Sequence, residues 1–307
     1  GKTVIFSEIV RQYLKNHNKR VLIMTHRIEL LTQTSKMLTE FGVINKVVNS
    51  TAKLDDQDQY SCFVAMVETL NNRLQDEKFD ISNIGLVIID EAHYNSFTKL
   101  FGYFDESFIL GVTATPLSSN IKLPMNDNYN ELIVGETIEA LIENEFLSRA
   151  NTYSYNVGLT SLEIGANGDY TVKSSEDLYT TNDMLSKLMH AYEEHSKGKK
   201  TLIFNNGINT SLHVYDAFNY AGYPVRHLDN TATKKQRQKI LEWFHLTPDA
   251  ILTSVSILTT GFDEPTVESI ILNRATKSLT LYYQMIGRGS RILKNKSTHP
   301  PSTFIDS

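Results

Sequence analysis

The sequence lacks the features of a secreted or membrane protein. Its one cysteine, Cys62, excludes an intramolecular disulfide and a cysteine-based zinc site, and is typical of a reducing, cytoplasmic environment. The chain has no unbroken apolar run of about 18 residues and does not open with a signal peptide, so neither membrane insertion nor secretion is expected. Its length of 307 residues favours two domains of about 150 residues each.

An excess of positive charge is also missing. The 35 Asp and Glu residues outnumber the 30 Lys and Arg residues, and the net charge of −5 argues against a protein that coats nucleic acid through overall basicity. One window departs from this average, because no Asp or Glu occurs between Ser269 and Ile305. This basic strip indicates binding to a polyanion at one place, and its charges are Arg274, Lys277, Arg288, Arg291, Lys294 and Lys296.

Short apolar runs alternate with helical spacing along both halves of the chain. This alternation is typical of parallel α/β sheets, so we expect an α/β fold with two parallel-sheet lobes and a cleft between them. The first half predicts strands at 21–24, 63–67, 86–89 and 108–112, and a helix at 27–41. The second half predicts strands at 202–204, 224–228, 250–253 and 269–272, and helices at 211–221, 233–245 and 278–287.

A stretch rich in Pro, Ser and Asn separates the two lobes. Residues 116–130 interrupt the apolar pattern, and we place the interdomain connection there or just after. A helix is expected at 136–146, and the polar stretch 151–181 is interpreted as a hairpin or an insertion. The resulting division has a first lobe at 1–118, a connector at 119–181 and a second lobe at 182–307.

The chain opens with Gly1, Lys2 and Thr3, followed by apolar residues compatible with a helix. These three match the end of G-x-x-x-x-G-K-[ST], a loop whose backbone N–H groups and lysine surround nucleotide phosphates while the Ser or Thr binds Mg²⁺. Three residues alone are weak evidence, because chance and ordinary turns also produce them. Since the chain begins inside the motif and without Met, we expect it to be a piece of a longer protein.

A second signal is the apolar run 86–89, which ends in Asp90, Glu91 and, after Ala92, His93. A carboxylate at the end of a strand can hold Mg²⁺ opposite a phosphate loop, and its neighbour can orient an attacking water. The alternative is a solvated acidic turn after a buried strand. The combination of strand, Asp, Glu and His after Gly-Lys-Thr favours the catalytic interpretation.

These residues and several later ones resemble the motifs of superfamily 2 helicases. Residues 90–93 spell the DEAH form of the family signature. Similar matches are 25–31 to motif Ia, 113–116 to motif III, 258–265 to motif V and 284–291 to motif VI, so the resemblance extends from the first residue to about Arg291. Residues 258–291 look most like the bacterial RadD-like branch of the DEAD/DEAH helicases.

The resemblance implies a pair of RecA-like lobes that bind ATP and Mg²⁺ in their cleft and nucleic acid across their top. DNA is favoured over RNA as this partner, although the sequence does not decide between them. The resemblance assigns each motif residue a role on this frame. The implied roles are phosphate binding for Gly1 and Lys2, metal binding for Thr3 and Asp90, orientation of the lytic water for Glu91, arginine fingers for Arg288 and Arg291 with Gln284 at the same interface, and coupling for His93, Thr113 and Thr115.

Motif V adds small residues near the end of a predicted strand. Thr259, Thr260 and Gly261 carry small side chains and accessible N–H groups, which suit close approach to a phosphate backbone. Asp263 is expected to accept from a sugar hydroxyl or from the opposite lobe, although a turn-capping Asp before Pro265 explains it nearly as well. We count Gly261 and Asp263 with the ATP- and phosphate-binding residues.

In the first lobe, contacts to nucleic-acid phosphates are expected at Arg27 and Thr69. Arg27 follows a predicted strand as in motif Ia, and its alternative is a solvated arginine at a helix start. Thr69 falls where motif Ib belongs, but Met66 and Glu68 stand where a Thr and a Gln are usual. Trp243 is interpreted as a core residue rather than as a platform for base stacking.

The leading hypothesis is an ATP-dependent nucleic-acid helicase or translocase in which lobe closure gates hydrolysis. The alternatives are a nucleic-acid clamp or platform with little ATP turnover, and the motor subunit of a restriction or repair complex. Taken alone, Arg288 and Arg291 fit a basic helix face at i, i+3, but the full Q-x-x-G-R-x-x-R spacing favours arginine fingers. No membrane partner is expected, and no protein partner is identified.

Overall fold

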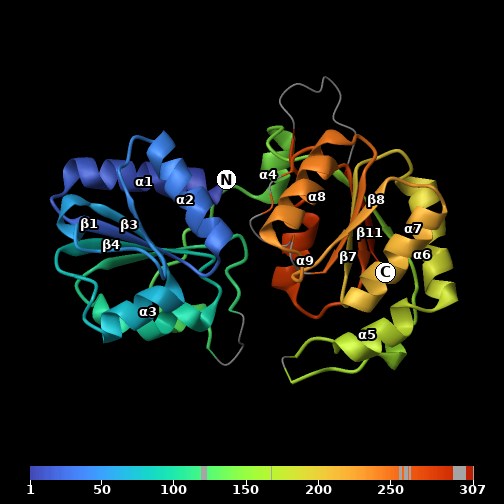
Figure 1. The fold of residues 1–307 in the computed structure, drawn as a ribbon, viewed down its shortest axis with the longest axis horizontal. Coiled ribbons are helices and arrows are strands. Elements are labelled where there is room, and N and C mark those ends of the chain that lie inside the picture. Colours follow the sequence, from blue (N-terminus) through green and yellow to red (C-terminus); the bar gives the residue numbers. More distant parts are fainter. Residues whose placement is uncertain are drawn as a thin grey trace. The chain divides into compact units, whose positions relative to one another are not determined.

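The computed structural model of the chain describes residues 1–118, 123–166, 168–255, 258, 262, 264–292 and 302–306. The chain divides into two compact units, Gly1–Val134 and Gly135–Ser307, each with its own sheet (Figure 1). The predicted domain limits stay predictions, but residues 135–181 of the predicted connector contribute helices and a strand to the second unit.

Within the described residues, the first unit contains a five-stranded parallel sheet in the order β2-β3-β1-β4-β5. The strands are β1 (Arg20–Thr25), β2 (Lys46–Val48), β3 (Cys62–Met66), β4 (Ile84–Asp90) and β5 (Phe108–Val112). The helices are α1 (Lys2–Asn16), α2 (Ile28–Glu40) and α3 (Val67–Gln75), and 3₁₀ segments lie at Gln57–Gln59, Asn95–Tyr103 and Met125–Asp127. The four predicted strands and the predicted helix are confirmed.

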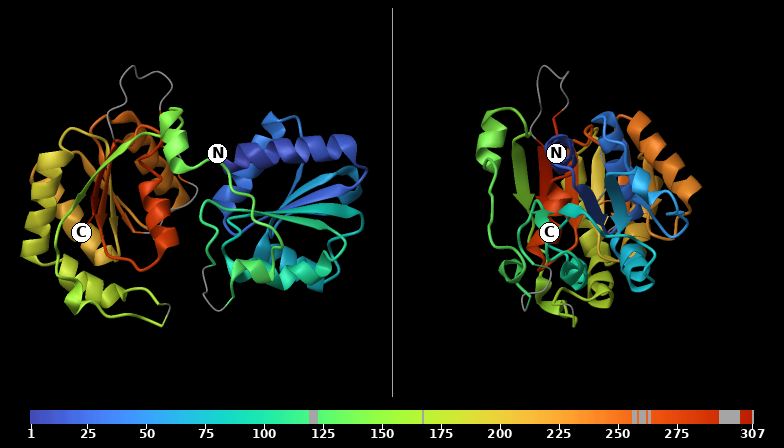
Figure 2. Two further views of the ribbon diagram at one scale, coloured as in Figure 1. Left: turned by 180° about the vertical axis from the view of Figure 1, so that it is seen from behind. Right: turned by 90° about the vertical axis from the view of Figure 1, so that its left-hand side faces the viewer.

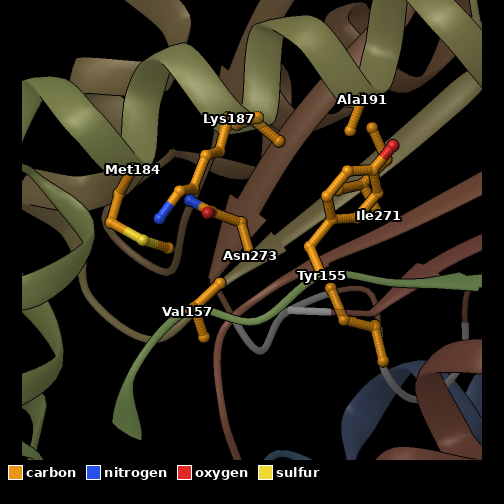
Figure 3. A pocket seen from close by; sticks show the side chains of 9 residues that line it. Tyr155, Val157, Met184, Lys187, Ala191, Ile271 and Asn273 are labelled. Atoms are coloured by element: carbon orange, nitrogen blue, oxygen red, sulfur yellow. The ribbon is translucent and has the colours of Figure 1, made fainter.

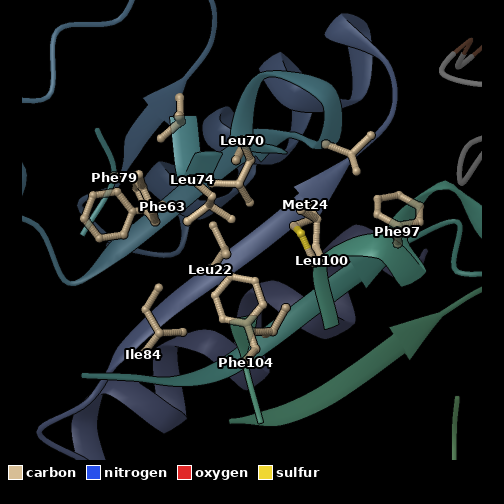
Figure 4. Close-up of a cluster of buried hydrophobic side chains, with 14 of the residues drawn as sticks. Leu22, Met24, Phe63, Leu70, Leu74, Phe79, Ile84, Phe97, Leu100 and Phe104 are labelled. Carbon is tan, nitrogen blue, oxygen red and sulfur yellow. The ribbon is translucent and has the colours of Figure 1, made fainter. Parts of the chain in front are cut away.

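Both faces of this sheet are covered, which explains why its central strands are continuous apolar runs. Leu22 and Met24 of β1 point into one buried cluster together with α3 and the 3₁₀ segment after β4 (Figure 4). Val21 and Ile23 pack on the opposite face against α1 and α2. Cys62 belongs to this second cluster and is fully buried, and burial raises the pKa of its thiol.

The second unit repeats the parallel arrangement with six strands among its described residues, in the order β6-β11-β10-β7-β9-β8. Helices α8 and α9 cover one face of the sheet, and α6 and α7 cover the other (Figure 2). The strands are β6 (Ala150–Ser154), β7 (Thr201–Asn205), β8 (Val225–Leu228), β9 (Ile251–Val255), β10 (Ser269–Asn273) and β11 (Ser302–Asp306). The helices are α4 (Ile138–Glu143), α5 (Val172–Tyr179), α6 (Asn182–His195), α7 (Ile208–Tyr220), α8 (Lys234–Leu246) and α9 (Leu279–Ile286), with a 3₁₀ segment at Leu159–Ser161.

The second unit confirms the predicted parallel α/β fold and its four predicted strands, but two local predictions differ from the structure. The helix expected at 136–146 is only α4, which ends at Glu143, and Glu145 has a left-handed backbone with φ 59° that a continuing helix excludes. The stretch expected as a hairpin or an insertion is a hairpin only in part: Ile164 and Tyr170 form an antiparallel bridge. The rest supplies α5, and the strand β6 at its start pairs with β11 as part of the main sheet.

Two further features follow from local sequence. The side chain of Thr233 accepts from the backbone N–H of Gln236, and Gln236 caps Thr233 in return, so α8 begins with a capping box. Among the described residues, no helix combines the length and the apolar character needed to cross a lipid bilayer.

Candidate nucleotide and nucleic-acid site

The predicted site residues of the first unit follow the carboxyl ends of its strands. Because parallel strands end at the same edge of a sheet, residues after different strands share one surface, where α/β proteins bind ligands. The site residues concerned are Arg27 after β1, Thr69 after β3, Asp90, Glu91 and His93 at the end of β4, and Thr113 and Thr115 after β5.

The structure brings Lys2 to the acidic pair. Lys2 is the first residue of α1, with Gly1 as the N-cap, and its Nζ lies 2.6 Å from Oε1 of Glu91. The two side chains are 28% and 13% exposed, so the ion pair is partly shielded from water. Thr3 follows in the same helical turn. The first turn of a helix presents backbone N–H groups that favour an anion, so Gly1, Lys2 and Thr3 fit a phosphate-binding role.

Asp90 is the most deeply buried acidic group of this edge, with 3% exposure. Burial raises the pKa of its carboxyl group to about 6, against the opposing effect of Lys2. Its Oδ1 accepts the backbone N–H of Glu91 at 3.0 Å. A buried carboxylate of this kind is stabilised by a nearby cation, so Asp90 fits a metal ligand.

The donor set fits Mg²⁺ better than a metal held by protein ligands alone. No group of three or more His, Cys, Asp or Glu side chains with metal-binding geometry occurs in the part of the chain that the structure describes. Mg²⁺ usually binds one or two carboxylates and completes its shell with waters and substrate phosphates. One carboxylate, Asp90, and one hydroxyl, Thr3, are therefore suitable ligands.

The loop after β4 holds Glu91 in an uncommon conformation. Glu91 has φ 56°, which a non-glycine residue adopts rarely and often at functional sites. The loop is fixed on both sides, because the N–H of Ala92 donates to the carbonyl of Val112 and the N–H of Tyr94 donates to the carbonyl of Glu91, both at 3.1 Å. The backbone of Glu91 is thus held in place, and its carboxylate oxygens lie 2.6 Å from Nζ of Lys2 and 3.5 Å from Nδ1 of His93.

His93 joins this loop to the end of β5. Its Nδ1 lies 2.9 Å from Oγ1 of Thr113, and that hydroxyl donates to the carbonyl of Thr115 at 3.0 Å. The proton shared by His93 and Thr113 is therefore assigned to Nδ1. Burial lowers the pKa of His93 against the opposing effect of the Glu91 charge, and the lowered pKa favours the neutral ring. The three predicted coupling residues are hydrogen-bonded to one another.

The predicted phosphate contacts of the first unit lie at helix starts. Arg27 is the N-cap residue of α2, and Thr69 lies in the first turn of α3. Both are partly exposed. Arg27 follows β1, which lies beside β4 in the sheet, and Thr69 follows β3, which lies beside β1. Their role in binding nucleic acid stays a prediction.

The second unit holds the remaining predicted residues. Gln284 lies in α9, and its Nε2 has no hydrogen-bond partner among the described residues. The alternative of a basic helix face is wrong for the arginines, because α9 ends at Ile286 and both arginines follow it. Arg288 donates to the carbonyl of Phe262, and Arg291 forms an antiparallel bridge with Leu147.

Half of motif V lies outside the described residues. This applies to Thr259, Thr260, Gly261 and Asp263, so the structure does not test their predicted contacts. The neighbouring Glu264 is described, and its carboxylate accepts from the N–H and hydroxyl of Thr266 and lies 2.8 Å from Nδ1 of His245.

The sequence analysis missed a buried polar network in the second unit. Polar side chains at the carboxyl edge of the sheet form one continuous chain of contacts of 2.8 to 3.0 Å. Its members, in order, are Asn273, Asn205, Thr253, Ser211, His227 and Asp229. The available signal was a polar residue at the end of each apolar run, but the partners become visible only when the strands are assembled.

This network contains a Ser, a His and an Asp in contact, the residue types of a hydrolase triad. Ser211 is fully buried, and its hydroxyl is shared between His227 and Thr253. A substrate therefore has no access to it. The network is structural, because it satisfies buried polar groups that would otherwise destabilise the sheet edge.

A small hollow in the second unit contains none of the predicted site residues (Figure 3). It lies between α6 and the sheet, and its lining is mainly apolar. The lining residues are Tyr155, Val157, Met184, Lys187, Leu188, Ala191, Ile271, Leu272 and Asn273.

Two protein families match the chain. Residues 1–118 match the family described as "Type III restriction enzyme, res subunit". Residues 180–293 match the family described as "Helicase conserved C-terminal domain". The first match lies in the unit Gly1–Val134 and the second in the unit Gly135–Ser307, so each parallel α/β unit is similar to a domain of restriction-enzyme or helicase proteins.

Relatives and a solved structure are also similar to the chain over most of its length. The "51.5 kDa protein" of Lactococcus phage (isolate 7-9) is 29% identical over 302 residues, covering 97% of this chain and 62% of that protein. "Putative ATP-dependent helicase IRC3" of Saccharomyces cerevisiae is 28% identical over 317 residues, covering 96% of this chain and 45% of that protein. The chain thus spans about half the length of these relatives. The structure of "ATP-dependent Type ISP restriction-modification enzyme LlaBIII bound to DNA" matches with a TM-score of 0.72 and 19% identity, covering 99% of this chain and 25% of that chain.

Proposed function

We propose that this chain is the ATP-driven motor of a nucleic-acid helicase or translocase. The observation that carries the proposal is the contact between Lys2 and Glu91 beside the buried carboxylate of Asp90. A phosphate-binding lysine, a metal-binding carboxylate and a second carboxylate for water are the groups that phosphoryl transfer requires. The matches to a restriction-enzyme subunit family and to a helicase domain family support the same conclusion.

The ion pair suggests how the site responds to nucleotide. Phosphate oxygens compete with Glu91 for Lys2, so nucleotide binding would release the Glu91 carboxylate to orient a water. Thr3 and Asp90 would hold Mg²⁺, which when bound supplies positive charge beside the phosphates. The fixed loop after β4 would then keep Glu91 in place, because its backbone is hydrogen-bonded on both sides.

We further propose that Arg288 and Arg291 act as arginine fingers, with Gln284 at the same nucleotide. Guanidinium groups supplied from a second body stabilise the charge that develops during phosphoryl transfer, and this makes hydrolysis depend on lobe closure. Motion of the two units between nucleotide states would then become steps along a strand held by both. Arg27 and Thr69, with Thr259 and Thr260, would hold the phosphate backbone, and Gly261 and Asp263 would approach the nucleotide.

We propose DNA as the nucleic acid, and the RadD-like branch as the place of the chain within superfamily 2. A second candidate is the motor subunit of a restriction complex, which the family match over residues 1–118 favours. A helicase separates the strands of the duplex, whereas a restriction motor moves along duplex DNA without separating its strands. Strand separation and duplex translocation assays on the full-length protein distinguish them. A cytoplasmic location remains part of the proposal.

The role of Glu91 tests the proposed function. In the full-length protein, Glu91→Gln keeps the size of the side chain but removes the base, so phosphate release stimulated by nucleic acid should fall about 100-fold or more. Equilibrium binding of ATP should persist. The control is Glu8→Gln on α1, which changes only surface contacts with Arg11 and Gln12 and should not change turnover. Wild-type turnover in Glu91→Gln would reject the proposed role.

A further inference from the structure

Tyr94 lies between two histidine rings in the first unit. The His26 ring, just after β1, is 4.3 Å from the Tyr94 ring between centroids, with an interplanar angle of 49°. The His93 ring is also 4.3 Å from the Tyr94 ring, with an angle of 41°. Phe97 meets the His26 ring edge-on at 6.5 Å. We name His26, Tyr94 and His93 the His–Tyr–His stack, which connects the turn after β1 with the loop after β4.

The hydrogen-bonding capacity of His26 is not used in this structure. Both ring nitrogens are buried, and neither has a hydrogen-bond partner among the described residues. Burial, assisted by Arg27, lowers the pKa of His26 to about 4, so the ring is neutral at pH 7. Unpaired buried donors and acceptors cost stability. The evident favourable contacts of the ring are therefore those with the neighbouring rings.

On the β1 side, the stack begins at the expected nucleic-acid contact. His26 is joined by one peptide bond to Arg27, the N-cap residue of α2. The hydroxyl of Thr25 donates to the carbonyl of Arg27 at 3.3 Å, which restrains this turn. Arg27 and the His26 ring therefore share one restrained turn.

On the β4 side, the stack ends at the catalytic loop. The backbone N–H of Tyr94 donates to the carbonyl of Glu91 at 3.1 Å. The His93 ring, packed on the other side of Tyr94, is hydrogen-bonded to Thr113. Tyr94 therefore joins the packed rings to the backbone of the loop that carries Glu91.

We propose that His26 and Tyr94 are positioning residues that couple nucleic-acid binding at Arg27 to the orientation of Glu91. The inference rests on the proposed function and adds a route to it that runs through ring packing. Neither residue touches the nucleotide in this role. Loss of a ring should therefore remove the stimulation of ATP turnover by nucleic acid, while basal turnover and the KM for ATP stay unchanged.

The experiment compares ring-removing and ring-preserving variants of the full-length protein. His26→Ala and Tyr94→Leu remove a ring, whereas His26→Phe and Tyr94→Phe keep one. We measure ATP turnover with and without single-stranded DNA, the Kd for that DNA, and Tm. His26→Ala and Tyr94→Leu should reduce the stimulation ratio about 5-fold or more, the range of typical coupling between sites. His26→Phe and Tyr94→Phe should keep the wild-type ratio.

A structural role would give a different result. His26→Phe removes two unpaired buried nitrogens, so its Tm should equal or exceed the wild-type value, whatever its effect on coupling. Wild-type stimulation in His26→Ala, or equal loss in His26→Ala and His26→Phe, would overturn the proposal. An equal fall of basal and stimulated turnover would also overturn it. If Tyr94→Leu does not fold, the comparison of His26→Ala with His26→Phe decides the test. A wild-type protein without any ATP turnover would instead reject the proposed function itself.

Discussion

The carboxyl edges of the two sheets have the same architecture and different chemistry. The edge of the first unit holds the charges of Lys2, Asp90 and Glu91, and the pKa of its most buried carboxyl group is raised by desolvation. The edge of the second unit holds a chain of mostly neutral side chains that satisfy one another's hydrogen bonds. Buried charge that is only partly compensated is typical of a site that awaits a ligand, whereas a satisfied network stabilises a fold.

The largest effect is expected where the first edge loses its positive charge. Lys2→Ala removes the ammonium group that would hold phosphate oxygens, and one lost electrostatic contact of this kind lowers turnover by about 100- to 1000-fold. The measurement is steady-state phosphate release by the full-length protein with DNA. Lys36→Ala, which affects only an exposed pair with Glu40, is the control. Equal turnover in Lys2→Ala and wild type would show that the charged edge of the first unit does not take part in hydrolysis.

A smaller effect, on stability alone, is expected at the second edge. Thr253→Val keeps the shape of the side chain but removes the hydroxyl that joins Asn205 to Ser211 in the network. The free energy of unfolding should fall by about 1–3 kcal/mol. Urea unfolding measures it, with Thr253→Ser as the matched variant that retains the hydroxyl. If Thr253→Val abolished turnover without loss of stability, the second edge would be catalytic rather than structural.

The smallest effect is a pH dependence of the unfolding free energy, caused by Asp229 at the second edge. Burial raises the pKa of Asp229, but the hydrogen bonds from His227 and Thr231 together lower it by more. The folded-state pKa therefore lies below the ordinary value. A lowered pKa means that Asp229 contributes stability above its unfolded pKa and loses it as the pH falls. The difference in unfolding free energy between wild type and Asp229→Asn should therefore shrink from about pH 5 to about pH 3. A constant difference across this range would show that the ionised Asp229 carboxylate does not contribute to the free energy of unfolding.

Sequence patterns predicted the first edge better than the second. The run ending in Asp90 and Glu91 is predictable because a strand buried on both faces is continuously apolar and its terminal charges are then conspicuous. The exposed edge strand β6 was not predicted, since its residues Ala150–Ser154 form no apolar run. The polar network and the His–Tyr–His stack were also missed, because each joins residues from separate strands and depends on their order in the sheet.

The burial of Cys62 makes the chain a convenient subject for thiol chemistry. Its thiol is fully buried on β3, so an alkylating reagent can reach it only when the first unit opens, and the labelling rate reports that opening. The sequence has no second cysteine. A cysteine introduced on the surface of each unit would therefore react selectively in the native state, and a dye pair attached there would follow the distance between the units through the ATP cycle.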